Sequence, residues 1–334
     1  MIDVAWLLVS LGIILLGAEF FTNSIEWLGK KLNLSEGAVG SILAAVGTAL
    51  PESMIPIIAI LFGAGEAGEE IGIGAILGAP FMLSTLAFFI AGMAVVMHAK
   101  RRPDFPSMNI DPSVITRDLG FFLLVYAVAV LASLIRLGFL RMIISLGLVA
   151  AYAIYAYQTV NEEKTLGEEH DLSPLFFQRN RQEPDLIMIL VQVLTSLAII
   201  VGGAHLFVRG IEHLAVRLGT PPFVLSLIIA PVATELPEKF NSIIWIGKGK
   251  DTLALGNITG AMVFQSSLIP ALGITLTEWK LSPGALVSAI LALTSTAVVY
   301  WYTYRKKRLT PFVLMWGGLF YLVFIVLVLG RIII

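Results

Sequence analysis

Ten long apolar runs divide this sequence and constrain its fold more than any other feature. Each run is long enough to cross the hydrocarbon core of a bilayer, about 30 Å thick, as a helix. The runs cover 4–28, 36–62, 71–97, 114–135, 139–158, 185–208, 222–246, 252–276, 282–304 and 311–330. Of the 334 residues 57% are hydrophobic and only 13% are charged, whereas a soluble domain is about 25% charged. The sequence therefore predicts an all-α integral membrane protein with ten transmembrane helices.

The remaining composition restricts the chemistry. A net charge of −1 gives no basic surface for nucleic acid, so we expect no nucleic-acid partner. The chain has no cysteine, which excludes disulfides and thiolate nucleophiles. It also lacks HExxH and GxSxG motifs, and its four histidines are not clustered. We therefore expect no enzymatic activity and no cofactor, and we expect oxygen atoms to carry the chemistry.

The two halves of the chain repeat each other. GAEFFTNSIEWL from Gly17 matches GAHLFVRGIEHL from Gly203, and TALPE from Thr48 matches TELPE from Thr234, both at an offset of 186 residues. A third match, GAILG with GNITG, has an offset of 182. We assign the four extra residues of the first half to a loop around 65–70. The acidic stretch that contains it, 63–70, is expected to be a solvated turn, with a role in concentrating cations as the alternative. Because each half has five crossings, an odd number, the second half must be inverted, as in many secondary transporters.

The repeats and the loop charges predict domains and orientation. The first repeat covers 1–160 and the second 185–334, with core segments near 37–97 and 222–276, and the polar linker is 161–184. Of the 22 Lys and Arg residues, fifteen lie in loops after odd-numbered runs and five on the opposite side. Loops of membrane proteins that are rich in Lys and Arg lie on the cytoplasmic side. We therefore predict a multi-pass protein of the cell membrane with extracellular termini and a cytoplasmic linker. The first run has no basic segment before it and no cleavage site, so we expect a spanning helix rather than a signal peptide.

A proline and a carboxylate interrupt the second and the seventh run. The carboxylates are Glu52 in AAVGTALPESM and Glu238 in APVATELPEKF. Proline removes a backbone hydrogen bond, and a carboxylate at membrane depth needs a counter-ion or a proton. Pseudo-symmetry brings the two glutamates together, and Thr48 and Thr234 lie one turn earlier on the same helix face. We therefore predict an oxygen-rich site for a hard cation, with Glu52 and Glu238 as its metal-binding pair.

With these motifs the sequence resembles the cation/calcium antiporter superfamily, to which the sodium/calcium exchangers belong. The resemblance covers essentially the whole chain and rests on GTALPE and ATELPE, each followed by a glycine-spaced helix, GAILG or GNITG. It implies two inverted five-helix repeats, a diamond of four sites lined by helices 2, 3, 7 and 8, and sliding of helices 1 and 6 to alternate access. It also implies cation-binding roles for Glu52 and Glu238 and for Thr48 and Thr234.

The chain departs from the family pattern at several expected ligands. The exchangers usually carry Ser-Asn and then a further Asn or Asp one turn on, in helix 3 and again in helix 8. The residues found instead are Ala79, Pro80 and Leu83 in helix 3, and Ala261, Met262 and Gln265 in helix 8. Calcium takes 6–8 oxygens, so a standard site for one calcium and three sodium ions is not implied.

Glu235 stands where the family has a serine, and it has two interpretations. It replaces the lost carboxylate of helix 8 as a ligand, or it pairs with Lys239 at i, i+4. Gln265 is a further candidate ligand, and Asn257 and Ser266 are candidates for additional neutral oxygens. Two polar residues at equivalent positions of helices 1 and 6 are candidates for gating or proton relay, with a structural role as the alternative. These are Glu19 and His205.

The sequence and the resemblance together predict a secondary active antiporter that exchanges Ca²⁺ for Na⁺ by alternating access. One alternative is a Ca²⁺/H⁺ antiporter, because desolvated glutamates accept protons. Others are a divergent member with altered cation selectivity, and a channel or non-transporting sensor on the same scaffold. The expected partners are the transported cations and the lipid bilayer, and no oligomer is required.

Overall fold

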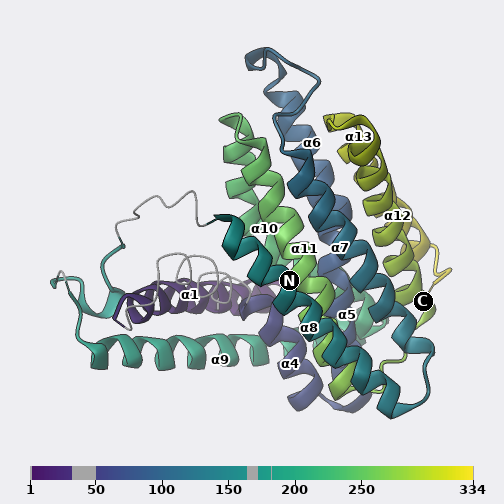
Figure 1. Cartoon of the computed structure of the whole chain (residues 1–334). Coiled ribbons are helices and arrows are strands. Elements are labelled where there is room, and N and C mark those ends of the chain that lie inside the picture. Colours follow the sequence, from purple (N-terminus) through teal and green to yellow (C-terminus); the bar gives the residue numbers. More distant parts are fainter. Residues whose placement is uncertain (1, 32–49, 164–171, 182, 334) are drawn as a thin grey trace.

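The computed structural model describes residues 2–31, 50–163, 172–181 and 183–333, and these residues are mainly helical (Figure 1). The long elements are α1 (Ile2–Lys31), α4 (Leu50–Phe62), α5 (Gly65–Met82), the π-helix η2 (Leu83–Ala87), α6 (Phe88–Met97), α7 (Pro112–Leu131), α8 (Gly138–Glu163), α9 (Leu186–Leu218), α10 (Pro222–Gly247), α11 (Asp251–Leu276), α12 (Pro283–Lys306) and α13 (Pro311–Leu329). Within the described residues, eight helical spans are long and apolar enough to cross a membrane, and two shorter apolar helices, Glu52–Phe62 and Pro222–Val232, accompany them. Since α5, η2 and α6 form one span, these elements correspond to the ten predicted helices.

Two predicted boundaries are wrong. The segment from residue 65 to 70 is not a loop, because α5 begins at Gly65 and carries an acidic residue in its first turn, where the helix dipole favours it. Four residues make about one helical turn, so the insertion in the first half lengthens a helix. The run predicted at 185–208 continues to Leu218. Its end is set by Gly219, whose φ of 60° is the left-handed conformation of a helix C-cap.

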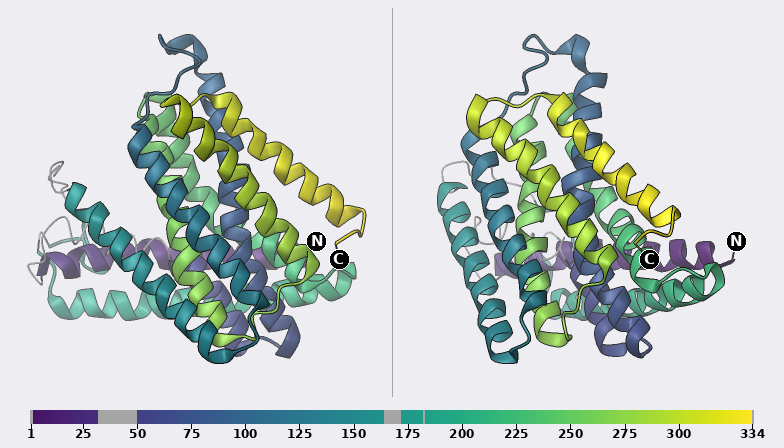
Figure 2. Two further views of the ribbon diagram at one scale, coloured as in Figure 1. Left: turned by 45° about the vertical axis from the view of Figure 1, so that its right-hand side comes forward. Right: turned by 90° about the vertical axis from the view of Figure 1, so that its right-hand side faces the viewer.

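The α1 and α9 helices lie side by side and run across the bundle of the other helices (Figures 1 and 2). Trp6 Nε1 donates to the backbone oxygen of Leu206 at 3.1 Å, and Gln192 Nε2 donates to that of Phe20 at 2.8 Å. Positions 6 and 192, and positions 20 and 206, each differ by 186. The two bonds are therefore pseudo-symmetric copies of each other, and they make α1 and α9 antiparallel. The inverted repeat is confirmed at this pair of helices.

The described end of the linker packs on α1 and α9. The backbone oxygen of Ser173 accepts hydrogen bonds from Asn23 Nδ2 at 3.2 Å and from Trp27 Nε1 at 2.9 Å. Leu175 is fully buried in a small apolar cluster with Trp27 and Ile189. The segment after residue 171 therefore ties the first and the sixth helix together.

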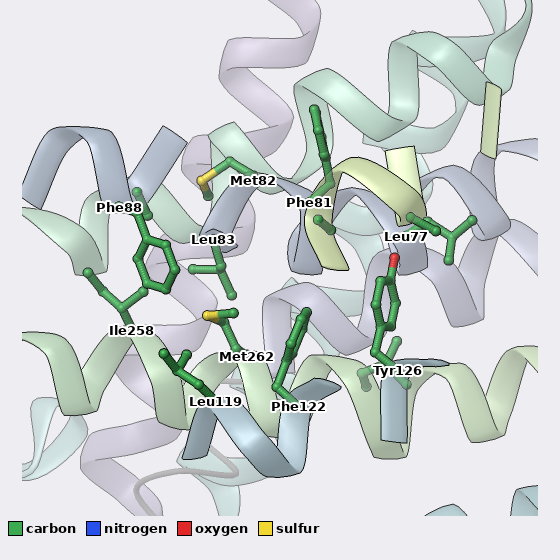
Figure 3. Packing of buried hydrophobic residues seen from close by; sticks show 14 of the residues in the cluster. Leu77, Phe81, Met82, Leu83, Phe88, Leu119, Phe122, Tyr126, Ile258 and Met262 are labelled. Carbon is green, nitrogen blue, oxygen red and sulfur yellow. The ribbon is translucent and has the colours of Figure 1, made fainter. Parts of the chain in front are cut away.

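The largest apolar cluster joins the third, fourth and eighth helices (Figure 3). Phe81 and Leu83 come from α5 and η2, Phe122 and Tyr126 from α7, and Met262 from α11, and all five are almost fully buried. Inside a bilayer such close packing, rather than exclusion of water, holds helices together. The cluster therefore fixes α11 against the first repeat, and α10 packs beside α11.

Candidate cation site

The second copy of the TxLPE motif lies inside the continuous helix α10. Thr234 and Glu235 are both buried, with exposed fractions of 2% and 1%. The Thr234 hydroxyl donates to the backbone oxygen of Ala230 at 3.1 Å, one turn earlier. The motif thus places a hydroxyl and a carboxylate in the protein interior at the depth of an apolar span, where an ionisable group is costly.

Glu235 contacts a predicted ligand from the next helix. Gln265 on α11, with an exposed fraction of 2%, donates from Nε2 to Glu235 Oε1 at 3.1 Å. A hydrogen bond to a carboxylate is stronger than one between neutral groups, and the same amide also carries an acceptor oxygen. The structure therefore joins two of the predicted residues, 30 positions apart in the chain. The side chain of Lys239, the other proposed partner of Glu235, lies outside the described residues.

The first copy of the motif is described from Leu50 onward. Glu52 lies in the first turn of α4 with an exposed fraction of 7%, and α4 contacts both α10 and α11. Thr48 and the side chain of Glu238 lie outside the described residues. The predicted pairing of Glu52 with Glu238 therefore stays a prediction.

Residues that replace the expected family ligands are packed in the protein interior. Ala79, Leu83 and Met262 are buried members of the core or of the helices that form it. Pro80 is followed by the π-helix η2, in which the Ser84 hydroxyl donates to the Pro80 oxygen at 2.7 Å. Interruptions of this kind are frequent at functional sites. The third helix thus has buried apolar residues at the positions where oxygen ligands were expected.

The lesser candidates are dispersed. Ser266 is buried and donates to the backbone oxygen of Val263 at 3.1 Å, and Asn257 is half-buried near the start of α11. Glu19 is exposed on α1, whereas the half-buried His205 ring lies 5.6 Å from that of Phe62. Among the side chains that are described, no group of three or more His, Asp or Glu residues could hold a metal ion. Any such group would have to include residues outside that part of the chain.

A further buried carboxylate lies outside the predicted site. Asp118 on α7 has an exposed fraction of 2% and contacts residues of α8 and α11. The sequence could have indicated this residue, because it places a carboxylate within the apolar run 114–135, next to Arg117. An ionisable residue within a membrane span is costly and is often functional.

Residues 2–160 and 188–332 match the sequence model of a family described as "Sodium/calcium exchanger protein". The chain belongs to this family. This exchanger is therefore a membrane protein of a family of transporters, and its general activity is cation/calcium antiport. The transported ions of the family are Ca²⁺ with Na⁺ or H⁺, as substrates rather than cofactors.

Known proteins resemble this exchanger over most of its length. The sodium/calcium exchanger MaX1 of Methanosarcina acetivorans is 26% identical over 304 residues, which cover 80% of this chain and 82% of that protein. The crystal structure of the H⁺/Ca²⁺ exchanger CAX has a TM-score of 0.70 at 16% identity and covers 98% of this chain and 82% of that one. The sodium-calcium exchanger NCX_Mj has a TM-score of 0.54 at 18% identity, with 96% and 97% covered. The fold is thus that of the solved exchangers.

Proposed function

We propose that this exchanger moves Ca²⁺ across the membrane in exchange for Na⁺ by alternating access. The observation that carries the proposal is the buried contact of 3.1 Å between Gln265 and Glu235, at the interface of α11 and α10. A carboxylate and an amide are oxygen ligands of the kind that Ca²⁺ takes. The name of the relative MaX1, a sodium/calcium exchanger, supports the same pair of ions.

The proposed ligands come from both copies of the motif and from α11. They are Glu52, Glu238, Thr48, Thr234, Glu235 and Gln265, with Asn257 and Ser266 as secondary oxygens and Glu19 and His205 as gating residues. The three glutamates together with Lys239 leave a formal charge of −2. This charge suits one divalent ion or two monovalent ions.

Proton coupling is the second candidate, and the apolar third helix favours it. Ala79 and Leu83 offer no side-chain oxygen, and Met262 on the eighth helix lies in the core. Sodium needs several neutral oxygens in its site, whereas a proton needs only one carboxylate whose proton affinity is raised by desolvation. The fold shared with the H⁺/Ca²⁺ exchanger CAX is compatible with this alternative.

The orientation follows from the loop charges. Extracellular termini, a cytoplasmic linker and a place in the cell membrane are the arrangement that the Lys and Arg distribution favours. The boundaries of the two repeats, 1–160 and 185–334, are part of the same proposal. One chain contains both copies of the motif, so no second subunit is needed to complete the site.

Flux measurements in proteoliposomes test the proposal. The purified chain is reconstituted, and Ca²⁺ uptake is followed with an outward Na⁺ gradient at constant pH, and separately with an outward H⁺ gradient without Na⁺. Accumulation above equilibrium in the first condition supports Na⁺ coupling, and accumulation only in the second supports H⁺ coupling. A channel equilibrates Ca²⁺ but does not accumulate it, so uptake that ignores both gradients would rule out antiport.

A further inference from the structure

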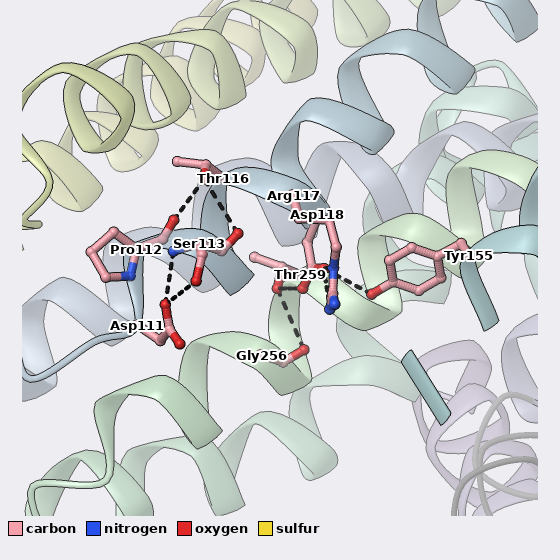
Figure 4. A network of polar contacts seen from close by, with 9 residues as sticks. All are labelled: Asp111, Pro112, Ser113, Thr116, Arg117, Asp118, Tyr155, Gly256 and Thr259. Atoms are coloured by element: carbon pink, nitrogen blue, oxygen red, sulfur yellow. Dashed lines mark hydrogen bonds and ion pairs between the residues drawn. The ribbon is translucent and has the colours of Figure 1, made fainter. Parts of the chain in front are cut away.

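Asp118 is the centre of a buried polar network that joins three helices (Figure 4). Its Oδ2 accepts a hydrogen bond from the Thr259 hydroxyl on α11 at 2.7 Å, and its Oδ1 accepts one from the Tyr155 hydroxyl on α8 at 3.0 Å. Arg117 forms an ion pair with the same carboxylate at 3.1 Å. The guanidinium of Arg117 also lies 5.5 Å from the centre of the Tyr155 ring. Each oxygen of this intramembrane carboxylate therefore has a donor, which such a group requires.

The same end of α11 is held by a second buried carboxylate. Asp251, at the start of the helix, is fully buried and binds both terminal nitrogens of Arg102, at 2.6 and 2.7 Å. It also accepts from the backbone nitrogen of Asn109 at 2.8 Å. Arg102 and Asn109 lie between the third and fourth helices, in the first half of the chain. The start of α11, from Asp251 to Thr259, is thus held by hydrogen bonds and an ion pair to residues of the first half, although α11 itself belongs to the second half.

Among the described residues, the contact through Thr259 has no counterpart in the first repeat, whereas Glu69, the counterpart of Asp251, accepts from the backbone nitrogen of Glu278 at 3.3 Å. Thr259 belongs to the GNITG motif, and its counterpart at the offset of 182 is Leu77, which is buried in the apolar core. The third helix, which contains Leu77, has apolar residues at its expected ligand positions. The eighth helix, which contains Thr259, has Gln265 in contact with Glu235. The polar anchor accordingly accompanies the helix that carries a candidate ligand.

Helix geometry connects the anchor to the site. Gln265 follows Thr259 by six residues, which is roughly 9 Å along the axis and about 120° around it. Thr259 therefore faces α7 and α8 while Gln265 faces α10, and α11 lies between them. A carboxylate that accepts charge-assisted bonds fixes both the rotation and the height of the helix it holds more firmly than apolar contacts do.

We propose that Asp118 is a positioning residue that sets the register of α11 and thereby holds Gln265 against Glu235 in the cation site. The proposal rests on the proposed function for its kinetic consequence, but its geometric consequence is independent of that function. Asp118 binds no transported ion in this scheme, and it acts through Thr259.

The kinetic test compares apparent KM and maximal rate of Ca²⁺ uptake for Asp118→Asn, Thr259→Val and the double variant. Thr303→Val is the matched control, because that buried threonine donates to Val299 within its own helix at 2.8 Å.

Loss of one hydrogen bond to a charged group predicts an apparent KM raised about tenfold, with the maximal rate changed less. The double variant should raise the apparent KM no more than the larger of the two single changes, since Asp118→Asn weakens and Thr259→Val removes the same hydrogen bond. An unchanged KM in Thr259→Val, or additive losses, would overturn the proposal. Because Thr259→Val leaves the ion pair of Asp118 with Arg117 in place, it tests the proposal even if Asp118→Asn does not fold.

The geometric test needs no transport. The native chain has no cysteine, so Glu235→Cys with Gln265→Cys provides a single thiol pair, which a short bifunctional thiol reagent links. Adding Thr259→Val should slow the cross-linking, whereas adding Thr303→Val should not. Equal rates in the two backgrounds would contradict the positioning role. If the unmodified chain transports no Ca²⁺ under either gradient but the cross-linking slows as expected, the proposed function fails and the positioning role stands.

Discussion

Gly17 of α1 and Gly203 of α9 lie against equivalent isoleucines of the opposite helix at the same distance. A Cβ added at Gly17 would lie 2.8 Å from a side-chain carbon of Ile200, and one added at Gly203 would lie 2.8 Å from the corresponding carbon of Ile14. Both pairs differ by the repeat offset of 186. The pseudo-twofold axis therefore passes between these two contacts, and the absence of a side chain at both glycines permits the close approach of the helices there.

The first prediction concerns this close approach. Gly203→Val should lower the free energy of unfolding by about 1–3 kcal/mol, because the added side chain collides with Ile14 and overpacks the interface. It should also slow transport if α1 and α9 move together. Gly202→Val is the control, since a Cβ at Gly202 meets nothing within 4 Å and the change in helix propensity is the same. Thermal unfolding in detergent measures both variants, and equal losses would contradict the proposed role of the glycines.

The second prediction concerns the pair of glutamates beside the prolines. Glu52→Gln or Glu238→Gln keeps the size of the side chain but removes one negative charge from the site, and a divalent cation depends on that charge. Each change should nearly abolish Ca²⁺ uptake while the protein still folds, because a neutral amide is less costly to bury than a carboxylate. The exposed Glu66 in the first turn of α5 is the control, and Glu66→Gln should transport normally. Wild-type rates in both site variants would remove these residues from the site.

A third prediction separates the two roles of Glu235. If Glu235 is a ligand, Glu235→Gln should raise the apparent KM for Ca²⁺ by at least about tenfold, and adding Lys239→Met should not restore it. If Glu235 only neutralises Lys239, the double variant should recover wild-type uptake. Uptake at a series of Ca²⁺ concentrations distinguishes the two outcomes, and we expect the first because of the contact with Gln265.

A fourth prediction concerns the buried ion pair at the start of α11. Asp251→Ala should cost about 3–5 kcal/mol in the free energy of unfolding, because it leaves the guanidinium of Arg102 buried without its carboxylate. The exposed pair of Glu278 with Lys280 is the control, and Glu278→Ala should leave the unfolding temperature nearly unchanged. Similar shifts in the two variants would mean that the buried pair does not anchor the helix.

A fifth prediction concerns the N-terminus of α7. The side chain of Asp111 accepts from the backbone nitrogen of Ser113 at 2.8 Å. The hydrogen bonds from the hydroxyl and the backbone of Ser113 lower the pKa of Asp111 below its usual value. Because the folded-state pKa is the lower one, the cap stabilises the fold at neutral pH and this stability is lost as the pH falls through that pKa. Asp111→Ala should therefore cost about 0.5–2 kcal/mol at pH 7, and the difference from wild type should shrink below about pH 4. Unfolding temperatures across this pH range provide the measurement, and a pH-independent difference would contradict the role of the charge.

The sequence by itself determined the membrane class, the ten helices and the inverted repeat. These features follow from composition and from internal repetition, both of which are present in the sequence whichever residues meet in space. A run of apolar residues must satisfy its backbone within a bilayer as a helix, and an odd number of crossings inverts the second copy. Glu52 and Glu238 could also be singled out in this way, because a carboxylate beside a proline within an apolar run is conspicuous wherever the helix lies.

Only the tertiary structure decided which polar residues meet. Glu235 and Gln265 are 30 positions apart, and the bond between them depends on how α10 and α11 pack. The same holds for Asp118, whose partners Tyr155 and Thr259 come from two other helices. The start of α5 at Gly65 was also missed, since glycine and glutamate are typical of loops and here extend a helix by a turn. The periodicity of apolar residues shows which face of a helix a residue occupies. Which residue it contacts on that face depends on long-range packing, and periodicity carries no information about that.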